Sequence, residues 1–229
     1  MAHPMTPDKL VRIAADFDRI AMVPEPPWTH NTHYHRTILA MLQTAGSRNV
    51  LEVGCGAGRL TGKIAEFSPI VTGIDLSPRM ITQARSRFGQ RDHVHFVQAD
   101  YLTTTPEHAW DAIVSVATVH HMDLHTFLCK ASRDLAPGGQ LIILDLYDQT
   151  RWEWILNAML WPLSAARRLW HNGRLRPSPD YLAAWRTHHE HDTFQRLREI
   201  RQIADEVIPG AVIRRMLFWR YLLHWVKPA

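Results

Sequence analysis

The chain has 229 residues, of which 46% are apolar and 21% charged, a composition that excludes collagen-like and disordered chains. This length is enough for one sizeable hydrophobic core. The formal net charge of +4 is uneven: residues 1–150 hold 13 Lys/Arg against 15 Asp/Glu, and residues 151–229 hold 13 against 7. Seven of the nine tryptophans also follow residue 150. The C-terminal part is therefore basic and rich in tryptophan, which any function must explain.

The cysteines and the apolar stretches bear on location. The chain has two cysteines, Cys55 and Cys129, which form no recognisable disulfide framework and favour a reducing compartment. The first ten residues lack the apolar core of a signal peptide. The stretch "WILNAMLWPLSAA" has 13 residues and contains a proline, so it is too short to span a bilayer. We therefore expect a cytoplasmic protein.

The N-terminal part predicts two helices. Apolar residues recur at helical spacing in residues 7–21, and a second helical pattern covers 30–45. The proline-rich segment "VPEPPW" separates them.

Short apolar runs then alternate with helical patterns. Strands are predicted at 49–53, 70–74, 94–97, 111–116 and 139–146, and helices at 59–67, 78–88 and 123–135. This alternation is typical of βαβ units, which form a parallel sheet with helices on both faces.

After Tyr147 the alternation stops. Residues 151–192 predict helices with loops around "HNGRLRPSPD", and 193–207 predict one more amphipathic helix. The final stretch "IPGAVIRRMLFWRYLLHWVK" predicts two strands, which fit an antiparallel edge. The predicted fold class is thus α/β: a Rossmann-like, doubly wound, mostly parallel sheet with an antiparallel C-terminal strand.

The sequence "LEVGCGAGRL" (51–60) joins the first strand to the following helix through Gly54, Gly56 and Gly58. Missing Cβ atoms allow a ligand to approach the backbone, and the helix N-terminus offers unpaired N–H groups. A dinucleotide, a nucleoside with an amino-acid tail and a plain turn are all compatible. The G-x-G-x-x-G/A fingerprint requires a small third residue where Arg59 stands, which disfavours NAD.

Acidic residues narrow the choice. Asp75 ends the second strand, where a carboxylate can accept both ribose hydroxyls, and Ser77 is the better helix cap. Asp100 ends the third strand and can accept from an adenine amine, with Leu76, Met80 and Tyr101 as apolar walls. Glu52 is expected beneath the loop, where it would orient the backbone.

Five segments, "VLEVGCGAG", "VTGIDLSPRMI", "VQADYL", "WDAIVSV" and "LAPGGQLIILD", resemble the ordered motifs of class I S-adenosylmethionine-dependent methyltransferases, small-molecule type, over roughly residues 45–148. The resemblance implies S-adenosylmethionine as cofactor. It assigns the glycine loop, with Cys55 as a small filler, to the methionine tail and ribose, Asp75 to the ribose and Asp100 to the adenine. It also implies that Ala117 lies beside the methionine part of the cofactor. The segment "WTHNTHYHR", which includes Asn31, would then cover the cofactor.

A single domain is expected: a helical cap (1–44), a cofactor-binding core (45–148), a helical lid (149–192) and a last helix with C-terminal strands (193–229). The acceptor pocket should lie above the strand ends. Histidine titrates near neutrality and can take a proton from an acceptor, so His121 is the first catalytic candidate. Further catalytic candidates are His120, His30 and Tyr34.

Two features of the C-terminal part leave alternatives open. We interpret "HHEH" (188–191) as a solvated surface cluster and expect no metal site. The tryptophans and arginines of 152–170 either line a pocket for a flat apolar acceptor, which we favour, or lie on a membrane surface, or pack the lid onto the sheet.

The function predicted is methyl transfer to a small aromatic or apolar molecule at nitrogen, oxygen or carbon, and secondary metabolism in a bacterium is the expected setting. The alternative is a nucleic-acid methyltransferase that uses the basic C-terminal part. The chain has "SVAT" where nucleic-acid amino methyltransferases often carry D/N-P-P-Y/F, which disfavours that alternative. The intact glycine loop and acidic residues disfavour a non-catalytic partner subunit. The spacing of the glycines disfavours an NAD oxidoreductase. The acceptor molecule and the oligomeric state stay open.

Overall fold

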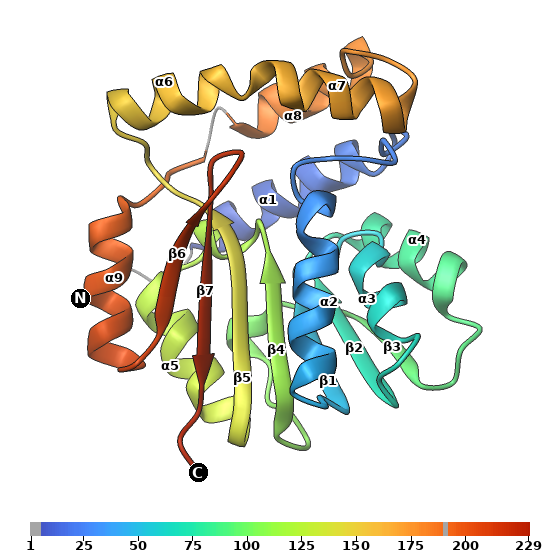
Figure 1. Ribbon diagram of the computed structural model, residues 1–229. Helices are drawn as coiled ribbons and strands as arrows, with labels where there is room; N and C mark the ends of the chain where they lie inside the picture. The colour runs from blue at the N-terminus through green and yellow to red at the C-terminus, as the bar shows by residue number, and fades with distance from the viewer. Residues whose placement is uncertain (1–5, 190–191) are drawn as a thin grey trace.

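The computed structural model describes residues 6–189 and 192–229. Seven strands form one sheet in the order β3-β2-β1-β4-β5-β7-β6 (Figure 1). The strands are β1 (Asn49–Val53), β2 (Ile70–Asp75), β3 (Val94–Gln98), β4 (Trp110–Val116), β5 (Leu135–Leu146), β6 (Val212–Met216) and β7 (Arg220–Val226). Strands β1 to β5 are parallel, β7 is antiparallel to β5, and β6 is antiparallel to β7. The predicted fold class is confirmed, including its antiparallel C-terminal edge.

Helices cover both faces of the sheet. They are α1 (Pro7–Ile20), α2 (His35–Thr44), α3 (Arg59–Ile64), α4 (Pro78–Phe88), α5 (Leu124–Asp134), α6 (Arg151–Met159), α7 (Trp161–Asn172), α8 (Pro179–His189) and α9 (Leu197–Val207), with the 3₁₀ turns η1 (Thr32–Tyr34), η2 (Tyr101–Thr103) and η3 (Val119–His121). Alternate strand residues face opposite sides. In β1, Leu51 packs in the core under α5 and α9, and Val50 packs in the core under α2, α3 and α4.

Local signals explain the helix starts. The Ser77 hydroxyl accepts the N–H of Met80 and Pro78 occupies the first turn, so α4 begins where the sequence predicts it. Strand β5 begins at Leu135, four residues earlier than predicted. Leu135 pairs with Trp110 across a register shift, so the "APGG" segment is an irregularity within the strand rather than a turn before it.

Helices α6, α7 and α8, which follow β5, lie over the carboxyl ends of the parallel strands (Figure 1). We call α6, α7 and α8 the lid. Helix α8 packs on α1, which brings the N-terminal part of the chain beneath the lid. Among the described residues, no helix is both long enough and apolar enough to cross a bilayer.

Candidate active site

A large cavity lies between the sheet and the lid. Its volume is about 1690 Å³, and its walls come from the glycine loop, the ends of β2 and β4, η3, the segment before α2, and α8. Ligand pockets usually enclose about 300–1,000 Å³. The cavity is therefore large enough for two small molecules side by side.

The three loop glycines have different roles. All have positive φ, at 74°, 51° and 78° for Gly54, Gly56 and Gly58. A Cβ on Gly54 would lie 2.1 Å from Oγ1 of Thr118, so this glycine lets the ends of β1 and β4 approach each other. A Cβ on Gly58 would press on Phe96 and Ala84 at 3.0–3.1 Å, and Gly58 does not line the cavity.

Only Gly56 leaves open space. A Cβ there would meet nothing closer than Sδ of Met80 at 3.9 Å, and the residue lines the cavity. Cys55, which also lines it, is a buried free thiol packed against Gly73, which fits its predicted role as a small filler. The loop therefore exposes backbone to a ligand mainly at Gly56.

The carboxyl groups of Asp75 and Glu52 lie beneath this loop. Asp75 accepts the N–H groups of Gly56 at 2.8 Å and Ser77 at 2.9 Å. Burial raises the pKa of Asp75, and these hydrogen bonds act against it. Burial also raises the pKa of Glu52 to about 8, and Glu52 accepts a hydrogen bond from the Thr61 hydroxyl. Both line the cavity. Glu52 thus lies beneath the loop, where the sequence analysis expects it, and the contact of Asp75 with ribose hydroxyls stays a prediction.

Of the residues predicted to contact the adenine, some line the cavity and one does not. Leu76, Met80 and Tyr101 line the cavity, and the Tyr101 hydroxyl donates to Asp134. Asp100 does not line it, because its Oδ1 accepts the N–H of Leu102 at 3.0 Å and caps η2. Contact between Asp100 and an adenine amine therefore stays a prediction.

The end of β4 turns sharply toward the cavity. Ala117 has φ 51°, an uncommon conformation for a residue with a side chain, and its N–H donates to Leu144 at 2.8 Å. Ala117 and Thr118 both line the cavity, and the predicted contact of Ala117 with the methionine part of the cofactor stays a prediction.

Two histidines follow this turn in η3, and they differ in chemistry. Nδ1 of His120 lies 2.6 Å from Oδ1 of the fully buried Asp145, whose Oδ2 accepts the His120 N–H at 2.8 Å. Burial alone would lower the pKa of His120, but the Asp145 carboxylate outweighs it and raises that pKa. Burial and the adjacent His120 lower the pKa of His121 to about 2. His121 is therefore the weaker base of the two, and which histidine acts in catalysis stays a prediction.

The segment before α2 covers one side of the cavity, as predicted. His30 and Asn31 line it. The His30 ring stacks on Phe218 at 4.6 Å, and burial lowers its pKa to about 3. Asn31 accepts two hydrogen bonds from the buried Arg220, which the sequence analysis did not select. Tyr34 does not line the cavity, because its hydroxyl donates to the Leu217 carbonyl, so its catalytic role finds no support here.

The interpretation of "HHEH" as a surface cluster is wrong for His188. This side chain is 3% exposed, lines the cavity, and contacts Phe17 and His121. His189 is exposed, and His191 lies outside the described residues. His188 and Asp192 are site residues that the sequence analysis missed, together with Tyr181 and Trp185 of α8. The histidine-rich spacing was the one available signal.

The favoured interpretation of the tryptophans in α6 and α7 is also wrong. Trp152, Trp154, Trp161 and Trp170 are 58–86% exposed, and none lines the cavity. Nor do these four pack the lid onto the sheet. The paired arginines face inward: Arg167 contacts His33 and Arg168 contacts His30, each at 3.4 Å.

Comparison with known sequences points to one family. The model of the methyltransferase domain family matches residues 51–143. An uncharacterized methyltransferase of Mycobacterium tuberculosis is 31% identical over 206 residues, which cover 89% of this chain and 99% of the relative. A demethylmenaquinone methyltransferase of Tropheryma whipplei is 33% identical over 135 residues, 58% of this chain and 56% of the relative.

Solved structures share the fold at low sequence identity. The N-methyltransferase NodS of Bradyrhizobium japonicum, crystallised with S-adenosyl-L-homocysteine, aligns with a TM-score of 0.63 and 19% identity over 95% of this chain and 99% of its own. Magnesium protoporphyrin IX methyltransferase of Synechocystis aligns with a TM-score of 0.63 and 16% identity over 96% and 100% of the two chains.

Proposed function

This chain belongs to the class I S-adenosylmethionine-dependent methyltransferases, and on that premise we propose that it methylates a small aromatic or apolar molecule at nitrogen, oxygen or carbon. The single observation that carries the proposal is the cavity of about 1690 Å³, which the glycine loop borders on one side and the lid on the other. One half is assigned to the cofactor and the other to the acceptor.

The residues present fit the cofactor. Gly56 has no side chain and has open space around its Cα, so a ligand can approach the backbone there. The buried carboxyl group of Asp75 can accept hydrogen bonds from ribose hydroxyls. Leu76 and Met80 supply apolar walls. S-adenosylmethionine supplies an electrophilic methyl group when it is bound. The protein's contribution is then to align the acceptor and exclude water from it.

The acceptor side combines aromatic walls with a histidine. Phe17, Trp28, Tyr181, Trp185 and Trp219 line the cavity, and flat apolar molecules pack well against such side chains. His120 is oriented by Asp145 through Nδ1, which leaves Nε2 to take a proton from an acceptor hydroxyl or ammonium. The lid would exclude water from this side.

The charge asymmetry is partly explained by the same cavity. Its walls include five basic residues of the C-terminal part, Arg168, Arg174, Arg176, Arg186 and Arg220. They favour an anionic group on the cofactor or on a small acceptor. A nucleic acid would instead be expected to meet a basic outer surface.

The exposed tryptophans support a second component of the proposal: α6 and α7 contact an anionic membrane surface, from which an apolar acceptor enters. Four tryptophans of α6 and α7 are 58–86% exposed and do not line the cavity. The two helices that carry them lie at the outer edge of the molecule, above the sheet (Figure 1). Amphipathic helices with exposed tryptophans bind lipid interfaces.

The activity is tested with purified protein, S-adenosylmethionine and a panel of phenols, quinols, indoles and aromatic amines, with mass spectrometry to detect a methyl group added to one of them. RNA is included as a competing acceptor. Methylation of RNA that falls steeply with salt, with no small molecule modified, would overturn the proposal.

A further inference from the structure

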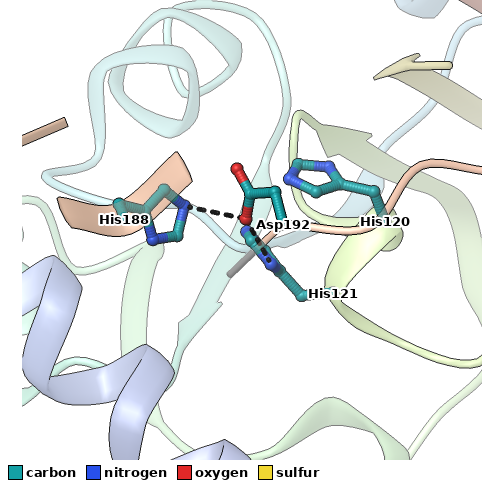
Figure 2. A group of neighbouring side chains, drawn as sticks. All are labelled: His120, His121, His188 and Asp192. Carbon is teal, nitrogen blue, oxygen red and sulfur yellow. Dashed lines mark ion pairs between the residues drawn. The ribbon is translucent and has the colours of Figure 1, made fainter. Parts of the chain in front are cut away.

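Four side chains from two distant parts of the chain meet at one point of the cavity wall. His120 and His121 lie in η3, His188 lies near the end of α8, and Asp192 follows four residues later. Each offers one ligand atom, and these atoms lie within 4.8 Å of one another. Figure 2 shows the three imidazole rings arranged around the Asp192 carboxyl group.

The distances from the Asp192 carboxyl group to the His121 and His188 rings are too long for hydrogen bonds but close to the distances between ligand atoms in metal sites. Oδ1 of Asp192 lies 3.6 Å from Nδ1 of His121 and 3.7 Å from Nε2 of His188. Hydrogen bonds between such atoms span about 2.7–3.2 Å. In tetrahedral zinc sites, bonds of about 2.0–2.2 Å place ligand atoms about 3.3–3.5 Å apart. A contraction of a few tenths of an ångström would bring these two pairs to ligand spacing. The ligand atoms that lie farthest apart, at up to 4.8 Å, would have to approach by more than an ångström.

His121 gives a second, independent indication. The residue is 7% exposed, and its Nε2 is buried without a hydrogen-bond partner in the part of the chain that the structure describes. Buried imidazole nitrogens are usually satisfied, because an unpaired one loses its hydration without compensation. An ion bound through Nε2 would relieve this, whereas an ion bound through Nδ1, the nitrogen that faces Asp192, would leave Nε2 unpaired.

The other two histidines have outer partners of the kind that metal ligands have. Nδ1 of His120 contacts Asp145 at 2.6 Å, and Nδ1 of His188 contacts Asp16 at 3.4 Å. A carboxylate on one ring nitrogen fixes the tautomer and directs the other nitrogen to the metal. In Figure 2, the ring nitrogen of His120 farthest from its backbone is directed toward Asp192, and a ring nitrogen of His188 is paired with Asp192.

We propose that His120, His121, His188 and Asp192 bind one divalent transition-metal ion, with Zn²⁺ as the best match to three imidazoles and one carboxylate. Mg²⁺ and Ca²⁺ prefer oxygen ligands and do not fit this set. Four protein ligands fill a tetrahedral shell, as in structural sites. The ion would join α8 to η3 and hold the lid over the cavity.

One consequence rests on the proposed function. An ion on Nε2 of His120 occupies the atom assigned to accept the acceptor's proton. The metal-loaded protein would then turn over more slowly than the metal-free one. Metal binding itself needs neither donor nor acceptor, so its failure and the failure of the proposed function are distinguishable.

The test uses the full chain, stripped with a chelator and titrated with Co²⁺ and with Zn²⁺. Four-coordinate Co²⁺ gives an intense visible absorption, and elemental analysis gives the Zn²⁺ content. We expect one ion per chain. His188→Gln and Asp192→Asn should each weaken binding about 100-fold or more, and Asp16→Asn about 10- to 100-fold. His171→Gln, at an exposed histidine of the lid, is the matched control and should bind like the parent.

Absence of the Co²⁺ spectrum and of stoichiometric Zn²⁺ in the parent protein would overturn the proposal. So would binding that His188→Gln and Asp192→Asn leave unchanged, because the ion would then lie elsewhere. If both of these variants fail to fold, as circular dichroism would show, His121→Asn replaces them. Unchanged binding in that folded variant would overturn the proposal.

Discussion

Nδ1 of His120 lies 2.6 Å from Oδ1 of Asp145, a carboxyl group that is fully buried at the end of β5. The same carboxyl group accepts the backbone N–H of His120, so Asp145 fixes both the turn and the ring. This pair connects the sheet to the cavity wall. It favours the tautomer in which Nδ1 of His120 carries the proton and Nε2 is free to accept one.

Asp145→Asn is expected to lower kcat about 10- to 100-fold, because the amide still fills the space but orients and stabilises the protonated ring less well. The dissociation constant for S-adenosylmethionine should stay unchanged, since Asp145 does not line the cavity. Steady-state kinetics and calorimetry measure the two quantities. Asp148→Asn, at an exposed carboxyl group nearby, is the control. Loss of cofactor affinity in parallel with kcat would contradict a positioning role.

Gly54→Ala is expected to destabilise the fold more than a positive φ alone would. The new Cβ would overlap the Thr118 side chain at 2.1 Å, and the overpacking costs about 1–3 kcal/mol beyond the strain of φ 74°. Gly46→Ala is the matched control, since Gly46 has φ 65° and open space around it. Urea unfolding of both variants measures the difference. Equal free energies of unfolding would show that the contact between Gly54 and Thr118 does not limit this position.

The stability of the protein is expected to fall as the pH drops below about 6.5, where free histidine takes up a proton. Burial lowers the pKa of His30 and of His35 to about 3, so the unfolded chain binds protons between these values that the folded chain does not. Each histidine then contributes at most about 1.4 kcal/mol of lost stability per pH unit. His35→Gln should reduce the dependence of the free energy of unfolding on pH between pH 6 and 4.

Denaturant unfolding at a series of pH values checks this. His95→Gln, at an exposed histidine of β3, should leave the dependence unchanged. If His35→Gln and the parent lose stability equally over this range, His35 is protonated in the folded protein and the expectation is wrong.

Replacing the exposed tryptophans is expected to weaken binding to anionic vesicles. A variant with Trp152→Ala, Trp161→Ala and Trp170→Ala should bind about tenfold or more weakly, because less apolar area can enter the lipid interface. Co-sedimentation with vesicles of phosphatidylcholine and phosphatidylglycerol measures this. Ile70→Ala removes an exposed apolar side chain at the start of β2, away from the lid, and serves as control. No binding by the parent protein would refute the membrane component.

The core was largely predictable because its signals are local. The apolar runs at 49–53 and the Ser77–Pro78 start of α4 reflect burial and capping within a few residues. Gly56, Asp75 and Ala117 lie at strand ends, where parallel order brings them to one edge of the sheet. The early start of β5 was missed, because Leu135 joins the sheet only through its pairing with Trp110.

The lid side of the cavity was not predictable in the same way. His188 is buried because α8 packs on α1, which brings Phe17 against it from a segment 171 residues earlier in the chain. No local pattern encodes that contact. The tryptophans of α6 and α7 were wrongly predicted for the opposite reason. Their apolar character indicates burial, but the structure leaves them exposed.

Calorimetric titration of the ligand-stripped protein with S-adenosylmethionine and with S-adenosylhomocysteine tests the central claim most directly. The account predicts one molecule of either ligand per chain. Asp75→Asn should bind about tenfold or more weakly, because a charged acceptor for the ribose is lost, while Asp92→Asn at an exposed site should bind like the parent. No binding by the parent protein, or equal affinity in Asp75→Asn, would contradict the account.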